Sequence, residues 1–345
     1  MRRTMVIPLA YRCLQPNASA VLPHRYPWQA EAMCGRYASS RRPEDMVEVF
    51  EIEGTDGPGP GADLTPGSAD NAGKDPNFGG PNYNVAPTQV APVVLERMPR
   101  PVETAGKEVP PEPAEGEEAP ADAAGAETPQ EPVRWLRGLT WGLVPSWAKD
   151  RSVGYKMINA RVESVLDKPA YRRAAMSRRC LVPADGWYEW QASPTEKDAK
   201  GKPRKQPFFV HPADGGVIAL AGVYELWRDP DRHADDPEAW LATYAVITTN
   251  AEPGLDVIHD RMPLVLPPDR WDDWLNPELR DPDAVRALMQ APPAGRFAAT
   301  AVTNRVNSVR NNGPELLEPA PLDQLRGVVD PATGELIGAG SEPLF

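Results

Sequence analysis

Short apolar runs separated by loops rich in glycine, proline and aspartate dominate the second half of the chain. Such runs are typical of β-strands, and we expect strands over residues 180–183, 186–191, 207–211, 217–227, 243–248, 263–266 and 298–302. Earlier in the chain, residues 83–95 read as a loop leading into a strand, and residues 135–144 as another strand. Because few helices intervene between these strands, the pattern predicts an α+β domain of mostly antiparallel sheets.

Helical spacing of apolar residues is confined to a few stretches. Residues 43–52 carry Met46, Val49 and Phe50 at this spacing, after a proline suited to the first turn. Similar patterns predict helices over residues 161–178, interrupted by Pro169, and over 269–275 and 282–289. We therefore expect helices flanking the sheets. No run approaches the ~18 apolar residues of a membrane span, so no membrane partner is expected.

Two stretches break this pattern. Residues 53–80 and 101–131 are rich in Gly, Pro, Ala and acids and carry net charges of −4 and −8, which together equal the −12 of the whole chain. Lacking apolar periodicity, they cannot bury enough surface to offset their ordering entropy. We expect disordered insertions within one domain over 34–320, followed by a C-terminal tail over 321–345. The remainder is formally neutral, so acidity does not exclude a polyanionic partner.

The cysteines are Cys13, Cys34 and Cys180, an odd number without metal-type spacing. This usage fits a reducing cytoplasm and predicts neither a disulfide framework nor a metal site. The chain also has no Gly-rich nucleotide-binding motif and no CxxC pair. We therefore expect no cofactor.

The dipeptide Met33-Cys34 offers unusual chemistry. If residues 1–33 are a mis-assigned start or a removable leader, Cys34 becomes the first residue and carries an amine beside a thiol. Their ordinary pKa values, about 7.7–8.0 and about 8.5, leave both partly deprotonated near neutrality. Such an aminothiol condenses with an aldehyde to an imine, and the sulfur then closes a thiazolidine. The alternative is an internal, buried thiol. A secretion signal is disfavoured because the apolar stretch 5–11 is short and contains a proline.

Two titratable residues lie in distinctive surroundings. Glu189 lies between aromatic residues in Trp187-Tyr188-Glu189-Trp190, where desolvation would raise its pKa and suit it to moving protons. The alternative is a carboxylate on the solvent face of a strand. His259 lies among acids and an arginine that can set its tautomer, as a general acid or base requires. The alternative there is a surface histidine in a turn.

Three further residues can recognise a polar or nucleic-acid ligand. Asn159 can orient a nucleophile or a sugar hydroxyl, and Arg161 can bind a phosphate through its planar guanidinium. Alternatively, Asn159 is an ordinary helix N-cap and Arg161 an exposed helical charge. Trp147 lies in a loop between proline and lysine residues, where its ring can stack on an unpaired base. A core tryptophan is the alternative.

Taken together, the motifs resemble the SOS-response-associated peptidase (SRAP) family, whose members are also called abasic site processing proteins. The resemblance covers about residues 34–318, apart from the insertions, and rests on the ordered strings MCGRY, YNVAP, WGLVPSW, NARVES, PADGWYEW, PFF, AGVYELW, TTNA, IHDRMP and VNSVRNNGPEL. It implies mixed sheets with flanking helices around a groove for single-stranded DNA. The N-terminal cysteine would lie at the floor of that groove.

The resemblance also implies roles for individual residues. Cys34 matches the residue that cross-links to the open-ring aldehyde of an abasic site, and Glu189 matches the acid near the cysteine amine. Asn159 matches the active-site amide, and His259 the histidine that assists ring opening and closure. Positions matching DNA contacts, with a wedge formed by the last two, are Gly35, Arg36, Asn84, Arg161, Pro87 and Trp147. With residues 1–33 attached, position 34 has an amide and thiazolidine chemistry cannot occur.

Two other functions stay open from the sequence. A cysteine peptidase would use Cys34, His259 and Asn159 as a Cys-His-Asn set, with self-cleavage before Cys34 as its natural form. A noncovalent module would only clamp single-stranded DNA. The family resemblance implies DNA-damage repair with cross-linking, autopeptidase (hydrolase) and lyase activities. We expect a cytoplasmic monomer that joins the nucleoid on DNA, with replication-fork proteins as candidate partners.

Overall fold

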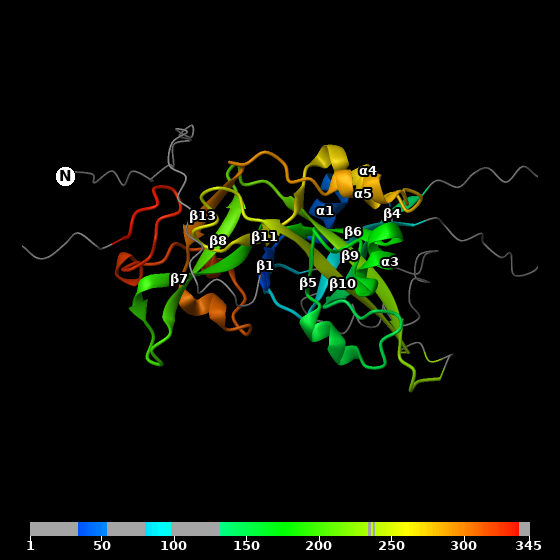
Figure 1. Ribbon diagram of the computed structural model, residues 1–345, viewed down its shortest axis with the longest axis horizontal. Coiled ribbons are helices and arrows are strands. Elements are labelled where there is room, and N and C mark those ends of the chain that lie inside the picture. The colour runs from blue at the N-terminus through cyan, green and yellow to red at the C-terminus, as the bar shows by residue number, and fades with distance from the viewer. Residues whose placement is uncertain (1–33, 54–79, 98–131, 234–235, 237–238, 338–345) are drawn as a thin grey trace, which may run out of the picture.

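The computed structural model describes residues 34–53, 80–97, 132–233, 236 and 239–337, whose strands form two sheets with short helices around them (Figure 1). The larger sheet runs in the order β11-β10-β4-β3-β6-β9-β12, with β5 paired to β10. The bounds of its strands are β3 (Val90–Arg97), β4 (Val133–Trp141), β5 (Asn159–Arg161), β6 (Arg179–Ala184), β9 (Ile218–Arg228), β10 (Trp240–Asn250), β11 (Arg261–Pro263) and β12 (Val265–Leu266).

The larger sheet closes on itself like a barrel, because β9 also pairs with β10, with Tyr224 opposite Tyr244. Among the described strands, β10 runs parallel to β4 and β5, and the remaining pairings are antiparallel. The predicted α+β class with mostly antiparallel sheets is therefore confirmed. Both faces of β9 are covered, which explains why its sequence is an almost continuous apolar run.

The smaller sheet runs in the order β13-β8-β7-β1-β2, and its β7–β8 hairpin extends to the lower left in Figure 1. Its strands are β1 (Arg36–Ser39), β2 (Asn82–Val85), β7 (Gly186–Lys197), β8 (Pro203–Pro212) and β13 (Phe297–Ala301). Side chains alternate between the faces of β7. Trp187 packs into the core shared with the larger sheet, whereas Tyr188 packs on the other face against Val302 and Val306.

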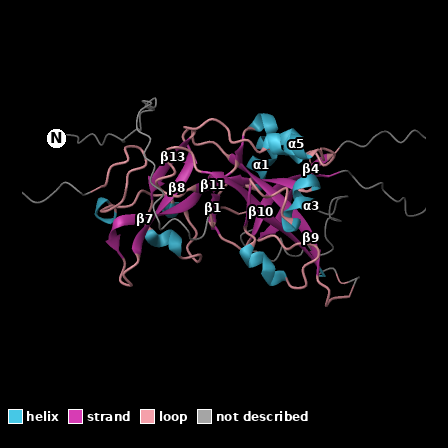
Figure 2. Ribbon diagram, in the orientation of Figure 1, coloured by secondary structure: helices cyan, strands magenta, loops and turns pink. Residues whose placement is uncertain are grey.

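A second core lies between the larger sheet and its helices, which gather around that sheet in Figure 2. These helices are α1 (Pro43–Val49), α3 (Pro169–Ser177), α4 (Trp271–Leu275) and α5 (Pro282–Leu288). Phe50 stacks on Trp271 with ring centroids 4.7 Å apart, which joins the end of α1 to α4. Short 3₁₀ helices lie at η2 (Arg151–Lys156), η4 (Pro268–Arg270), η5 (Asn304–Asn307), η6 (Pro314–Leu316) and η7 (Leu322–Gln324).

The helix predicted over residues 161–178 is wrong in its first half. Residues Asn159–Arg161 form β5, which pairs with β10 through Val246, and turns follow up to residue 168. Helix α3 begins only at Pro169, whose fixed φ and missing N–H suit the first helical position. The local apolar spacing could not reveal a three-residue strand whose hydrogen bonds come from a distant segment.

Two other predicted elements are divided. The strand predicted over 263–266 is split, because β11 pairs with β10 and β12 pairs with β9. Leu264 lies between them, with its N–H donating to Ile247 O and its carbonyl accepting from Ala221 N, both at 2.8 Å. The loop expected at the start of 83–95 is wrong in part, because Asn82–Val85 forms β2, and a turn in which Thr88 has φ +75° then leads into β3.

The described part of the segment expected as a C-terminal tail packs against β7. The Gln191 side chain donates to Val329 O at 2.9 Å and accepts from Val329 N at 2.7 Å, and Ser193 Oγ donates to Gly327 O at 2.6 Å. Packing of the fold thus continues beyond residue 320 to 337. The expected leader 1–33, the insertion 101–131 and all but the ends of the insertion 53–80 lie outside the described residues. Among described helices, none has the length and apolarity needed to cross a membrane.

Candidate functional site

Cys34 lies at the start of the described chain, two residues before β1, with an exposed fraction of 3%. Strand β1 pairs antiparallel with β7, with Arg36 opposite Tyr188. Extending this register by one residue places Glu189 opposite Gly35. The backbone N of Cys34 consequently donates a hydrogen bond to Glu189 Oε1 at 2.9 Å.

Glu189 lies on the same face of β7 as Trp187, because the two are two residues apart on a strand. That face packs against the larger sheet, so the carboxyl group is 3% exposed. Burial raises the pKa of Glu189 to about 8, and hydrogen bonds from the thiol and backbone N–H of Cys34 offset this only in part. The predicted desolvation of this carboxyl is confirmed, and the solvent-facing alternative is wrong.

The Cys34 thiol shares this buried environment. Burial, followed by the negative charge of Glu189, raises the pKa of the thiol well above its ordinary value. The sulfur is therefore protonated at neutral pH, and the thiol forms a hydrogen bond with the Glu189 carboxyl group. The Cys34 backbone has φ +23°, a conformation that is strained for a residue with a side chain.

Asn159 reaches the same site from the larger sheet. Its Nδ2 donates to the Cys34 carbonyl at 3.2 Å, and its own carbonyl accepts a hydrogen bond from the Tyr171 hydroxyl on α3 at 3.0 Å. The N-cap interpretation is wrong because Asn159 is the first residue of β5. Residues of both sheets and one helix thus fix the position of Cys34.

His259 lies between β10 and β11 and is 7% exposed, so the surface-histidine alternative is wrong. Its Nδ1 accepts the backbone N–H of Arg261 at 3.0 Å, from which we assign the proton of the neutral ring to Nε2. Within the described structure Nε2 is buried without a hydrogen-bond partner. Burial lowers the pKa of His259, which favours the neutral ring at pH 7. When the ring is protonated, Nδ1 carries the second proton and can donate a hydrogen bond to Asp260 Oδ1, 3.1 Å away.

Hydrogen bonds join Cys34 to Glu189 and to Asn159, whereas His259 is related to these residues through the charge of Asp260. The negative charge of Asp260 raises the pKa of Cys34, Glu189 and His259 alike. Leu255 and Ile258, just before His259, also pack in the hydrophobic core that contains Cys34. Cys34, Glu189 and His259 therefore share one electrostatic neighbourhood, and Asn159 is joined to it by its hydrogen bond to Cys34.

An ion pair between buried Arg261 and half-exposed Glu163 lies beside this neighbourhood. Arg261 donates to Glu163 through both terminal nitrogens, at 2.6 and 3.0 Å, and also to Asn250 Oδ1 and the Thr248 carbonyl. Burial opposes ionisation of Glu163, but the Arg261 hydrogen bonds outweigh it and lower the pKa of Glu163. Sequence reasoning missed Glu163, because its partner lies 98 residues away. The only signal was a carboxylate in the same motif as Asn159 and Arg161.

Two of the predicted DNA contacts are occupied within the protein. Arg36 is half-buried, and its Nη1 donates to Asn84 Oδ1 and to the Val306 carbonyl, both at 2.9 Å. Asn84 is 1% exposed and directs its amide at backbone carbonyls of the segment after β13. Gly35 is half-buried between Cys34 and Arg36. DNA contacts through these residues stay predictions.

The other predicted contacts are more accessible. Trp147 is 65% exposed, so the core-tryptophan alternative is wrong for this residue. Arg161 is exposed at the end of β5, and Pro87 is half-buried in the turn before β3. Tyr155, which the sequence did not single out, is 61% exposed in η2. Exposed aromatic rings are a feature of surfaces that stack on unpaired bases.

No group of three or more His, Cys, Asp or Glu side chains in the described residues is placed to hold a metal ion. Cys180 is buried in the barrel, where burial raises the pKa of its thiol well above the ordinary value. Of the two cysteines in the described residues, Cys34 is the one whose backbone nitrogen and thiol both contact a carboxyl group, that of Glu189.

The fold and the site together define a class of protein. It is an α+β domain in which a buried cysteine just before the first strand contacts a carboxyl group and an amide. The chain belongs to the SOS response associated peptidase (SRAP) family, whose model matches residues 33–309. The expected family is thereby confirmed.

Several named proteins are similar to this chain in sequence. "Abasic site processing protein YoqW" of Bacillus subtilis is 41% identical over 180 residues, covering 52% of this chain and 75% of that protein. "Abasic site processing protein HMCES" of Gallus gallus is 33% identical over 215 residues, covering 55% and 59% respectively. "Abasic site processing protein YedK" of Escherichia coli is 33% identical over 180 residues, covering 52% and 72%.

A solved structure supports the fold. A Bacteroides thetaiotaomicron protein superposes with a TM-score of 0.58 at 19% identity, covering 84% of this chain and all of that one. At this identity the likeness bears on the fold alone.

Proposed function

We propose that this protein processes abasic sites in single-stranded DNA by forming a thiazolidine between Cys34 and the open-ring aldehyde of the damaged sugar. The observation that carries the proposal is the 2.9 Å contact between the Cys34 nitrogen and the buried carboxyl of Glu189. The names of the relatives support the damaged-DNA substrate. The family match, which begins one residue before Cys34, supports a mature chain that starts there.

Glu189 prepares the nucleophile. Once residues 1–33 are absent, an α-amine takes the place of the amide at the same nitrogen. Its ammonium form and the Glu189 carboxylate then titrate as a coupled pair. A carboxyl whose pKa burial raises to about 8 accepts a proton from the ammonium near neutral pH more readily than a solvated carboxylate does. The free amine attacks C1′ of the aldehyde.

The condensation balances with the loss of one water. The amine adds to the aldehyde carbon, and the carbinolamine hydroxyl leaves as water when the imine forms. The Cys34 sulfur then adds to the imine carbon as its proton passes through Glu189, and the ring nitrogen ends protonated as a secondary amine. The hydrogen bond between the thiol and Glu189 gives this proton a direct route.

His259 and Asn159 complete the mechanism. The buried Nε2 of neutral His259 serves as the donor to the sugar ring oxygen as the abasic site opens. Asn159 fixes the Cys34 carbonyl, so the amine cannot rotate away from Glu189. Holding both reactants in place replaces a bimolecular encounter with an oriented one.

Single-stranded DNA would be held by the residues around this cluster. Arg36 and Arg161 neutralise flanking phosphates, which makes noncovalent binding weaken with salt. Trp147 and Pro87 form the wedge that limits duplex on one side of the lesion, and Gly35 and Asn84 complete the contacts near Cys34. The exposed ring of Trp147 supports this assignment.

A second activity, self-cleavage before Cys34, is favoured by the backbone of that residue. Its φ of +23° is strained while a peptide bond precedes it, and an N-terminal residue has no φ to strain. Peptidase activity then serves maturation, with DNA capture as the main function. We expect the mature protein to be a cytoplasmic monomer, associated with the nucleoid on DNA.

The test is incubation of protein starting at Cys34 with a single-stranded oligonucleotide that carries one abasic site. We expect a band that resists denaturant, is absent with Cys34→Ser and is absent with a ring analogue that cannot open to an aldehyde. A second arm measures the intact mass of the full chain and its Glu189→Gln variant. Absence of a denaturant-resistant adduct with the 34-start protein would overturn the proposal.

A further inference from the structure

Segment 304–312, which contains η5 and the loop after it, is fastened to the smaller sheet by side chains rather than by strand pairing. From β2, Asn84 Nδ2 donates to the carbonyls of Val306, Ser308 and Asn311 at 3.2, 3.0 and 3.0 Å. From β7, Trp190 Nε1 donates to Asn307 Oδ1 at 2.8 Å.

Further hydrogen bonds attach the segment to the chain around the start of β2 and stabilise the segment internally. Asn312 Oδ1 accepts the backbone N–H of Tyr83 at 2.8 Å, and its Nδ2 donates to the Pro81 carbonyl at 3.2 Å. Within the segment, Asn311 Nδ2 donates to the Arg305 carbonyl at 2.7 Å. An irregular loop held by this many side-chain contacts is a defined surface.

Asn84 is the centre of this attachment. The residue is 1% exposed, and its two amide hydrogens are shared among three carbonyls. Its Oδ1 accepts Arg36 Nη1, which also donates to the Val306 carbonyl. Because Arg36 is two residues after Cys34, one guanidinium group connects the strand of the reactive cysteine to segment 304–312.

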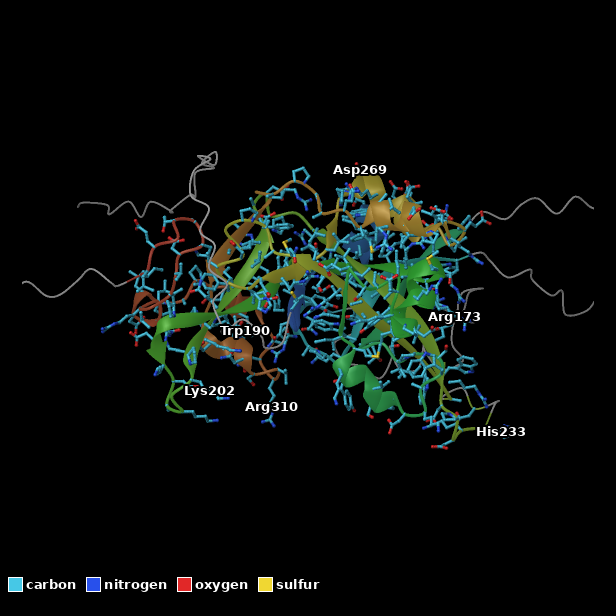
Figure 3. All side chains as sticks on the ribbon, viewed as in Figure 1. Arg173, Trp190, Lys202, His233, Asp269 and Arg310 are labelled. Carbon is cyan, nitrogen blue, oxygen red and sulfur yellow. The ribbon has the colours of Figure 1, made fainter. Side chains whose placement is uncertain are left out.

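The outer side of the segment is cationic. It contains Arg305 and Arg310 and no acidic residue. Arg305 is 61% exposed on its side chain and lies 3.6 Å from Glu315. Within the part of the chain that the structure describes, no carboxylate pairs with the Arg310 guanidinium, which projects from the lower edge of the molecule in Figure 3. Val309 beside it is 48% exposed.

We propose that segment 304–312 is a binding site for the phosphate backbone of single-stranded DNA, contacted by Arg305 and Arg310 and positioned by Asn84. This inference rests on the proposed function and adds residues to its DNA-binding surface. In this inference Asn84 acts through the segment that it holds. A guanidinium presents several donors in a plane, which suits phosphate oxygens. Because Asn84 holds segment 304–312 in place, the segment loses less conformational entropy when it binds DNA.

The test measures noncovalent binding of the full chain to an undamaged single-stranded oligonucleotide by fluorescence anisotropy over a range of salt. Arg310→Glu should weaken binding about 10-fold at low salt. Lys202→Glu, an equal charge change at the exposed β7–β8 hairpin tip labelled in Figure 3, should weaken it less than about 2-fold. Arg310→Ala should reduce the slope of log affinity against log salt by about 0.7, the value of one phosphate contact on a single strand.

The positioning role of Asn84 is tested with a double-mutant cycle. Asn84→Asp replaces the donating amide with an oxygen that repels the three carbonyls. In that background Arg310→Ala should change affinity less than 2-fold. If Asn84→Asp does not fold, Trp190→Phe removes the attachment to Asn307 while keeping an aromatic ring, and should reduce the Arg310→Ala effect in part.

The outcomes separate this inference from the proposed function. In protein starting at Cys34 and at limiting concentration, Arg310→Glu should slow cross-linking of an abasic oligonucleotide in proportion to its weakened binding, whereas Lys202→Glu should cross-link it at the wild-type rate. Equal weakening by Arg310→Glu and Lys202→Glu, or an unchanged salt slope in Arg310→Ala, would overturn the inference and leave the function intact. Wild-type protein that neither binds single-stranded DNA nor cross-links it would overturn both.

Discussion

Two glutamates of this protein, one buried and one half-exposed, show opposite responses to their surroundings. Glu189, beside Cys34, contacts an N–H and a thiol, and burial raises its pKa to about 8. Glu163, one turn after β5, contacts the guanidinium of Arg261, and the pKa of that carboxyl is lowered. The residue type is the same, and both lie in motifs that the sequence marks.

The difference distinguishes a carboxyl group suited to accepting a proton from one that stabilises the fold. A carboxylate that faces a fixed cation is stabilised as an anion and holds its neighbours in place. A carboxyl buried without a contacting cation exchanges its proton near neutrality, which costs stability but suits a proton acceptor. The cation beside Glu163 ties the turn after β5 to β11, whereas Glu189 contacts an N–H and a thiol and keeps a raised pKa. Four experiments can break or sharpen this comparison.

The largest expected effect is on cross-linking. Glu189→Gln keeps the shape of the side chain but removes the proton acceptor, so the rate of adduct formation should fall about 100-fold or more. Glu163→Gln is the matched control, and it should change that rate less than about 3-fold. Rates are followed on denaturing gels with 34-start protein and an abasic oligonucleotide. Equal losses in the two variants would show that the carboxyls do not differ in role.

Next in size is the stability supplied by the ion pair. Arg261→Ala should lower the free energy of unfolding by about 2 kcal/mol, since Glu163 and the Thr248 carbonyl lose a buried charged donor. Arg310→Ala removes an exposed arginine and should cost less than about 0.5 kcal/mol. Urea denaturation gives both values. A cost for Arg261→Ala as small as that for Arg310→Ala would mean that the pair contributes nothing to the fold.

The pH dependence of stability should carry opposite signs for the two carboxyls. In the unfolded chain each has a pKa near 4.5. Glu189 has a raised pKa in the folded state, so its contribution is fully present below pH 4.5 and is lost as pH rises towards about 8, by at most about 1.4 kcal/mol per unit. Glu163 has a lowered folded pKa, so its contribution is present above pH 4.5 and is lost as pH falls.

These signs can be measured by thermal unfolding of the full chain between pH 3 and pH 9, with the peptide bond before Cys34 verified intact by mass. Glu189→Gln should flatten the decline between pH 5 and pH 8, whereas Glu163→Gln should alter only the acid limb. A wild-type curve that rises between pH 5 and pH 8 and is unchanged by Glu189→Gln would contradict the raised pKa.

The smallest effect is expected at the support of Asn159. Tyr171→Phe deletes the hydroxyl that donates to the Asn159 carbonyl and should cost about 1 kcal/mol or less. Cross-linking should slow less than about 3-fold, because Asn159 keeps its contact with Cys34. Urea denaturation and the gel assay report the two quantities. A loss as large as that of Glu189→Gln would place Tyr171 within the chemistry.

Sequence reasoning was most successful where the signal was local. The apolar runs of β7 and β9 were predicted because both faces of these strands are covered. The burial of Glu189 was predicted as one of two alternatives, since a carboxyl between bulky rings is desolvated wherever those rings pack. The helix predicted from 161 was wrong at its start, because the hydrogen bonds of β5 come from β10.

By itself, the order of residues determined the α+β class, the position of the Met33-Cys34 dipeptide and the family to which the chain is similar. These follow from periodicity and from short strings that remain readable without coordinates. Tertiary structure alone decided that Glu189 contacts the nitrogen of Cys34, that Asn84 faces inward and that Arg261 pairs with Glu163. Each of these contacts joins residues at least 48 positions apart, and their geometry depends on strand register and sheet closure, which local pattern does not encode.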